Sequence, residues 1–155
     1  MKTAGRVPLL VAAGCSAAVA ALHIAILLMG PPWYRYFGAP SLAARIETGA
    51  GLVPWLMTLG VAALCAVWTG YGLSAAGVIG RWPLLRAALY TIAAVYLLRG
   101  LELIPDLVFL AQGRIPLRFA VFSAFSAFAG SVYLLGAVQN GRAPRVAPPL
   151  ARLVP

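Results

Sequence analysis

The chain has 155 residues, of which 63% are hydrophobic and only 10% are charged, and its mean hydropathy is +0.93. Soluble domains carry roughly 25% charged residues, so this composition excludes a large water-soluble module and predicts an integral membrane protein. The net charge of +9 does not indicate nucleic-acid binding, because the basic residues lie in the predicted loops and tails. There they are suited to orient the helices and to attract anionic lipids on the cytoplasmic side.

Apolar runs long enough to cross ~30 Å of hydrocarbon follow one another along the chain. They predict helices over residues 7–29, 48–73, 84–104 and 117–138, and an extension of the third helix to 111, past a kink at Pro105, is an alternative. No alternating strand pattern competes with them. We expect an all-α fold, a transmembrane four-helix bundle over residues 1–140, followed by a Pro- and Arg-rich cytoplasmic tail over 141–155.

The N-terminal segment MKTAGRVPLLVAAGC imitates a signal peptide that ends at a lipoprotein cysteine. Two features favour an uncleaved first helix: the position three before Cys15 is Ala12, and the apolar run continues over residues 17–29. Cys15 and Cys65 lie far apart inside apolar runs and lack the spacing of metal ligands. We interpret both as small core residues and predict neither a metal site nor a cofactor.

The first connection, over residues 30–47, is rich in aromatic residues. Trp and Tyr settle at the boundary between membrane and water, so we interpret this loop as an interfacial anchor, with a recognition loop as the alternative. A short surface helix is predicted over residues 41–47. The loop residues singled out are Trp33, Tyr34, Arg35 and Tyr36.

The distribution of basic residues predicts the orientation of the bundle. Four helices place the N-terminus, the 74–86 loop and the tail on one side, together with Lys2, Arg6, Arg81, Arg86, Arg142, Arg145 and Arg152. The other side holds Arg35, Arg45, Arg114 and Arg118. Because basic loops stay inside, we expect both termini in the cytoplasm and the chain in a bacterial-type inner membrane.

The acids of the chain all fall in the predicted outer half. Arg99 lies about 18–23 Å along the third predicted helix, past the midplane of a ~30 Å core, and His23 lies about 24 Å along the first. At 100° per residue, the polar residues of the third helix share about a third of its circumference, and a lipid-facing Arg is costly. We therefore expect one polar cluster that faces the bundle interior and contains His23, Glu47, Tyr96, Arg99, Glu102 and Asp106.

The fourth predicted helix has two dissimilar faces. Its small residues are Ala120, Ser123, Ala124, Ala127, Gly130 and Ser131, and its aromatic residues are Phe119, Phe122, Phe125 and Phe128. Small residues allow close helix contact, so we expect that face to pack inside the bundle. The Phe face is expected to meet lipid, a partner subunit or a second copy of the chain.

The stretches WYRYFGAP, YGLSAAGVI, PLLR and YLLRGL, together with His23, resemble an uncharacterised family of small bacterial four-helix integral membrane proteins. The family pattern runs WYRFFGAGE, YALSGAG, LPLLR and IYLLRG, and its matches here are Trp33, Tyr34, Arg35, Phe37, Gly38, Ser74, Gly77, Pro83, Arg86, Tyr96, Arg99 and Gly100. The resemblance covers residues 20–136 and implies a four-helix membrane fold without a particular activity. The chain departs from the pattern at Pro40 and Ser41, where the family has an acid. In this chain Glu47 is the residue that would take the place of that acid.

Three interpretations of the polar cluster remain open at this level. It is a structural ion-pair network, a site for a ligand, proton or lipid, or an acid–base pair made by His23 with Glu47 or Asp106. Our leading expectation is a non-enzymatic binding or accessory protein for a partner or an amphiphilic ligand. The alternative is a small membrane enzyme acting on a lipid-soluble substrate.

Overall fold

Every described secondary-structure element is a helix, which confirms the all-α prediction for the described residues, 5–141. The computed structural model contains α1 (Arg6–Met29), α2 (Pro31–Tyr36), α3 (Pro40–Glu47), α4 (Leu52–Ala75), α5 (Leu85–Gly100), α6 (Leu103–Ala111) and α7 (Leu117–Gly141). The tail predicted over 141–155 lies, apart from its first residue, outside the described range. Pro31 and Pro40 each begin a helix, where the missing N–H has no intrahelical partner.

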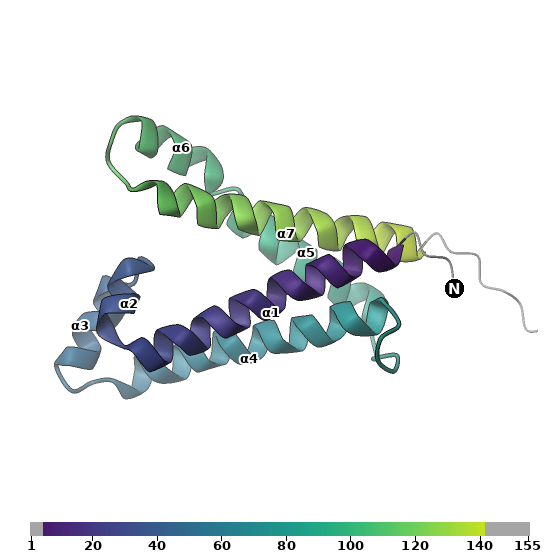
Figure 1. Cartoon of the computed structure of the whole chain (residues 1–155), viewed down its shortest axis with the longest axis horizontal. Coiled ribbons are helices and arrows are strands. Elements are labelled where there is room, and N and C mark those ends of the chain that lie inside the picture. The colour runs from purple at the N-terminus through teal and green to yellow at the C-terminus, as the bar shows by residue number, and fades with distance from the viewer. Residues whose placement is uncertain (1–4, 142–155) are drawn as a thin grey trace, which may run out of the picture.

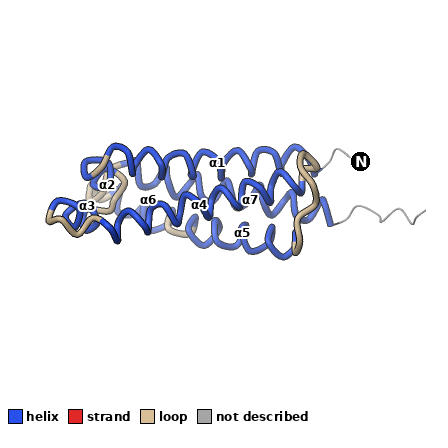
Figure 2. Tube along the Cα trace, turned by 90° about the horizontal axis from the view of Figure 1, so that it is seen from below, coloured by secondary structure: helices blue, strands red, loops and turns tan. Residues whose placement is uncertain are grey.

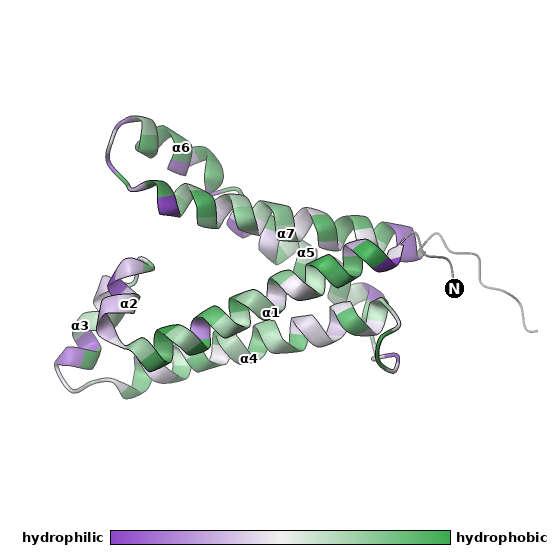
Figure 3. Ribbon diagram, viewed as in Figure 1, coloured by the Kyte–Doolittle hydropathy of each residue, from purple (hydrophilic) through white to green (hydrophobic). Residues whose placement is uncertain are grey.

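Three helices are long and apolar enough to cross a membrane. They are α1, α4 and the Leu117–Asn140 part of α7, each with 24 residues, and Figure 3 shows how hydrophobic α1 and α4 are along their length. By contrast, α5 has 16 residues, or ~24 Å, and does not cross a ~30 Å core alone. These helices support a membrane protein. The third predicted helix is not continuous over 84–104, but after a break the helical structure reaches Ala111, close to the alternative that extends it to 111 past a kink.

That third helix is divided because the chain turns at Leu101 and Glu102. The Leu101 N–H donates to the carbonyl oxygens of Leu97 and Leu98, over 2.9 and 3.2 Å, and so closes the end of α5. The Asp106 N–H donates to Glu102 O over 2.9 Å and closes the first turn of α6. Pro105 lies in this first turn, where its missing N–H is not needed. It therefore helps to begin a new helix rather than kinking an old one.

The long helices form two antiparallel pairs, α1 with α4 and α5 with α7 (Figure 1). In the view of Figure 2 the long helices run in nearly the same direction. The pairs meet at the end that holds both described chain ends, where a Cβ on Gly5 would lie 3.4 Å from Asn140 N. Toward the other end the pairs diverge, and α2 and α3 lie beyond the end of α1 (Figure 1).

Small residues bring the helices of each pair into close contact. A Cβ on Gly100 would lie 2.6 Å from the Ala127 Cα, and one on Gly130 would lie 2.8 Å from the Leu97 N. Between α1 and α4, a Cβ on Gly72 would lie 2.9 Å from the Ala13 Cβ. On α7 the small-residue face is only partly buried: Ala120, Ser123 and Gly130 are buried, whereas Ala124 and Ser131 are exposed.

Candidate functional site

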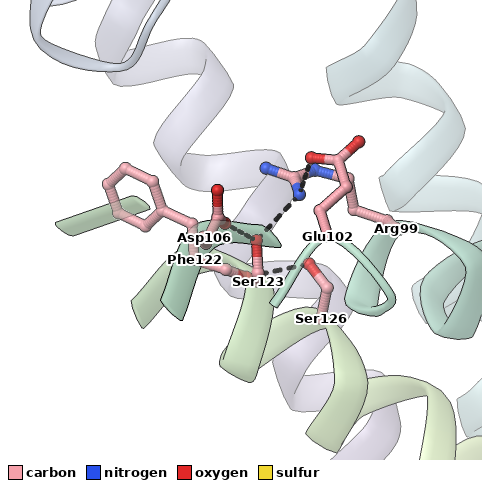
Figure 4. A network of polar contacts seen from close by, with 6 residues as sticks. All are labelled: Arg99, Glu102, Asp106, Phe122, Ser123 and Ser126. Carbon is pink, nitrogen blue, oxygen red and sulfur yellow. Dashed lines mark hydrogen bonds and ion pairs between the residues drawn. The ribbon is translucent and has the colours of Figure 1, made fainter. Parts of the chain in front are cut away.

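The turn between α5 and α6 brings together Arg99, Glu102, Asp106 and Ser123, which we call the break cluster. Arg99 Nη1 donates to Glu102 Oε2 and, over 3.0 Å, to Ser123 Oγ. Ser123 Oγ donates its single proton to Asp106 Oδ2 over 2.5 Å. In Figure 4 the guanidinium lies between Glu102 and Ser123, and Asp106 lies next to Ser123. One short chain of hydrogen bonds therefore joins α5, α6 and α7.

The break cluster does not face the bundle interior. This corrects the prediction that the polar residues of the third helix face inward. The side chains of Arg99 and Glu102 are 43% and 59% exposed, and only Ser123 is fully buried. The predicted orientation placed these residues at 100° intervals along one continuous helix, whereas the chain turns between Arg99 and Asp106. In addition, Gly100 packs against Ala127 of α7, whereas the adjacent Arg99 contacts α7 through its guanidinium, at Ser123.

Tyr96 belongs to a separate buried network at the meeting point of the two helix pairs. Its hydroxyl lies 3.1 Å from Ser16 Oγ, which lies 2.9 Å from the Tyr133 hydroxyl. The Tyr133 hydroxyl donates to Trp68 O over 3.0 Å. Since each hydroxyl has one proton, the bonds run in a single direction: Tyr96 to Ser16, Ser16 to Tyr133, and Tyr133 to the Trp68 carbonyl. The network links α1, α4, α5 and α7 and leaves none of these hydroxyls unbonded.

His23 lies in a pocket of about 200 Å³ near the end of α1. The pocket is lined by His23, Ile26, Tyr34, Phe37, Ala39, Leu42, Met57, Thr58 and Val61. His23 Nδ1 lies 2.8 Å from Val19 O; because a carbonyl only accepts, Nδ1 is the donor of this bond, and no bond within the described residues uses Nε2. The wall is otherwise mostly aliphatic and aromatic, so the pocket combines an apolar interior with few polar groups.

The first loop is only partly an exposed anchor. Tyr34 is 2% exposed and donates to Thr58 Oγ1 over 2.8 Å, so it is a core residue that fixes α2 onto α4. Trp33 is half-buried, whereas Arg35 and Tyr36 are exposed. Ile26, Tyr34 and Ala43 form a small apolar core of their own under α2 and α3.

Glu47 forms an ion pair with Arg35 over 2.5 Å, with both side chains about half exposed (49% and 45%). This pair joins the end of α3 to α2. Among residues 5–141, no hydrogen bond or ion pair connects Glu47 or His23 to the break cluster. The single outer-half cluster expected from the sequence is thus not formed, and its six residues belong to four groups: the break cluster, the Tyr96 network, the His23 pocket and the Arg35–Glu47 pair.

Contacts between α2 and the start of α7 hold the diverging ends of the two helix pairs together. Arg118 Nε donates to Tyr36 O over 2.9 Å, and the guanidinium carbon lies 4.7 Å from the centre of the Tyr36 ring. The Phe37 and Phe122 rings are 5.4 Å apart. Gly38, at φ +89°, lies against Phe119, where a Cβ would be 2.7 Å from the ring. Two of the Phe residues predicted to face lipid or a partner therefore pack on Phe37 and Gly38, directly after α2.

Sequence reasoning missed Ser123, Ser16 and Thr58, which connect the charged and aromatic residues to neighbouring helices. Ser123 was assigned to a small packing face, and the only signal of its role was its position at the depth of Arg99. The described residues contain no group of three or more His, Cys, Asp or Glu side chains able to hold a metal ion. No protein-family model, no curated protein and no solved structure matches this chain.

Proposed function

We propose that this chain is a four-pass protein of a bacterial-type inner membrane that binds an amphiphilic ligand in its outer half, without catalysing a reaction. In this proposal α5 and α6 together make the third pass, since α5 alone is too short. The adjacency of Gly5 and Asn140 supports an even number of passes. The excess of basic residues on the side of the termini supports a cytoplasmic location for both ends.

The observation that carries the binding function is the His23 pocket. Ligand sites are concave and mostly apolar, with a few polar groups that orient the ligand, and this pocket has that composition. Its volume of about 200 Å³ is below the ~300–1,000 Å³ of sites that enclose a whole small molecule. It therefore suits part of a ligand, such as a segment of an acyl chain, whose remainder stays in the bilayer.

The depth of the pocket fits the same ligand. His23 lies six residues, ~9 Å, before the end of α1, and so within the outer half. His23 Nε2 offers one hydrogen-bonding atom beside the apolar wall. An enzyme that uses His23 with a carboxylate is less well supported, because the carboxylates of Glu47, Glu102 and Asp106 are bonded to other residues.

The test is photolabelling of the purified protein with a diazirine-bearing palmitic acid. The expected result is labelling concentrated on pocket residues such as Met57, and a severalfold loss of labelling in Val61→Trp, which fills the pocket wall. The matched control is Val67→Trp, because Val67 is also on α4 and similarly exposed, 45% against 41%, but does not line the pocket. Equal labelling of the two variants would show that the acid only coats the helices.

A further inference from the structure

The charged groups of the break cluster use only part of their bonding capacity within the described protein. Arg99 makes both of its bonds through Nη1, which leaves Nη2 and Nε without a bond to any residue in 5–141. Glu102 accepts through Oε2 and Asp106 through Oδ2, so each carboxylate keeps one oxygen that no described residue binds. The cluster therefore presents both a cationic edge and two anionic oxygens to its surroundings.

The depth of the cluster makes these open groups unusual. Ser123 lies six residues from Ala129, the middle residue of α7, and hence ~9 Å to the outer side of the helix centre. A core of ~30 Å extends about 6 Å further. Half-exposed charges at this depth are costly against hydrocarbon. A polar group is therefore expected to face them.

The position of the guanidinium indicates from which side that group arrives. Gly100 packs against Ala127, whereas the Arg99 guanidinium bonds to Ser123, four residues, ~6 Å, closer to the outer end of α7. The Arg side chain thus extends toward the outer surface, as snorkelling side chains do. Bilayers thin locally around intramembrane charge, so we expect thinning to bring the head groups across the remaining distance. A lipid head group is placed to reach the cluster.

The signs of the charges select the head group. With Arg99 at +1 and Glu102 and Asp106 at −1 each, a simple anion would meet two carboxylates, and a simple cation would leave the free guanidinium edge unoccupied. A zwitterion satisfies both: its phosphate takes two N–H donors of the guanidinium, and a primary ammonium supplies three donors to the carboxylates. We propose that the break cluster binds a phosphate–primary-amine head group, as carried by an aminophospholipid of the outer leaflet.

The site is separate from the His23 pocket and does not need it, although it rests on the proposed membrane placement. The test is native mass spectrometry of the detergent-purified full chain with three lipids that carry identical dioleoyl chains. Phosphatidylethanolamine has both groups, phosphatidylcholine lacks N–H donors, and phosphatidylglycerol lacks the amine. The expected affinity for phosphatidylethanolamine is about tenfold higher than for either of the other two, which corresponds to ~1.4 kcal/mol. Equal affinities in the wild-type protein would overturn the proposal, and this measurement requires no variant to fold.

A double variant, Glu102→Gln with Asp106→Asn, removes both negative charges with almost no change in shape. It is expected to lose the preference for phosphatidylethanolamine, whereas Glu47→Gln, which removes the acid of the separate Arg35 pair, is expected to keep it. A preference that survives in the double variant would overturn the assignment. So would a wild-type dimer that forms without lipid and dissociates in the double variant, because a second copy would then cover the cluster.

Two further measurements are needed. One distinguishes a lipid head group from the same head group free in solution, and the other distinguishes this proposal from the pocket proposal. If soluble glycerophosphoethanolamine bound as tightly as the lipid, the shared chemistry would be supported and the lipid would be overturned as its source. Val61→Trp is expected to leave the preference for phosphatidylethanolamine unchanged. If fatty-acid labelling shows no focus on the His23 pocket while this preference persists, the pocket proposal fails and the head-group proposal stands.

Discussion

Replacing Tyr133 with Phe tests whether the buried hydroxyl network holds the two helix pairs together. The change removes one oxygen and two interhelical hydrogen bonds, to Ser16 and to the Trp68 carbonyl, of 2.9 and 3.0 Å. Tyr133 and Ser16 are both 0% exposed, so water does not replace the lost partner. Interhelical hydrogen bonds in membrane proteins contribute ~0.6 kcal/mol on average and up to ~1.7. We therefore expect Tyr133→Phe to lower the free energy of unfolding by about 1–3 kcal/mol.

The measurement is reversible unfolding by SDS in mixed micelles, followed by circular dichroism. Tyr90→Phe is the matched control, since Tyr90 is 39% exposed on α5 and the same oxygen is removed outside the network. Combining Tyr133→Phe with Ser16→Ala should give a non-additive loss, with a coupling of at least ~0.5 kcal/mol. A Tyr133→Phe protein as stable as Tyr90→Phe, or strict additivity with Ser16→Ala, would refute the reasoning.

Three other predictions concern packing, the α2 contact and orientation. Gly100→Ala should lower the free energy of unfolding by about 1–3 kcal/mol, because the new methyl meets the Ala127 backbone. Gly14→Ala is the control, since Gly14 has open space around it and should tolerate the methyl. Equal SDS unfolding curves for the two variants would contradict this prediction. Arg118→Ala should speed hydrogen exchange over residues 31–48, because it frees Tyr36 at the end of α2. Global stability should change by less than ~1 kcal/mol. Unchanged exchange over residues 31–48 would show that the Arg118–Tyr36 contact is dispensable. A reporter fused to the C-terminus should be active only in the cytoplasm, and activity outside would reverse the proposed topology.

The sequence by itself determined the class of the protein and most of its helix boundaries. Helices predicted over 7–29 and 117–138 correspond to α1 (Arg6–Met29) and α7 (Leu117–Gly141), and the short helix predicted over 41–47 corresponds to α3. These features depend on the hydropathy of each segment and on proline positions, which are local properties. The free energy of inserting a segment into the hydrocarbon core is close to a sum of contributions from its own residues. Predicting it therefore requires no knowledge of neighbouring helices.

Only the tertiary structure decided how the polar residues are grouped. Tyr96 and Arg99 are three residues apart, yet one is bonded in the core and the other is exposed at the end of α5. α5 ends at Gly100, which packs on Ala127 of α7, and the chain then turns at Leu101 and Glu102. After this turn Asp106 meets Ser123 on α7. Depth along a helix is a local quantity, but the partner of a side chain depends on which helices lie beside it. Long-range packing sets that arrangement, and it separated His23 and Glu47 from the residues with which they were expected to cluster.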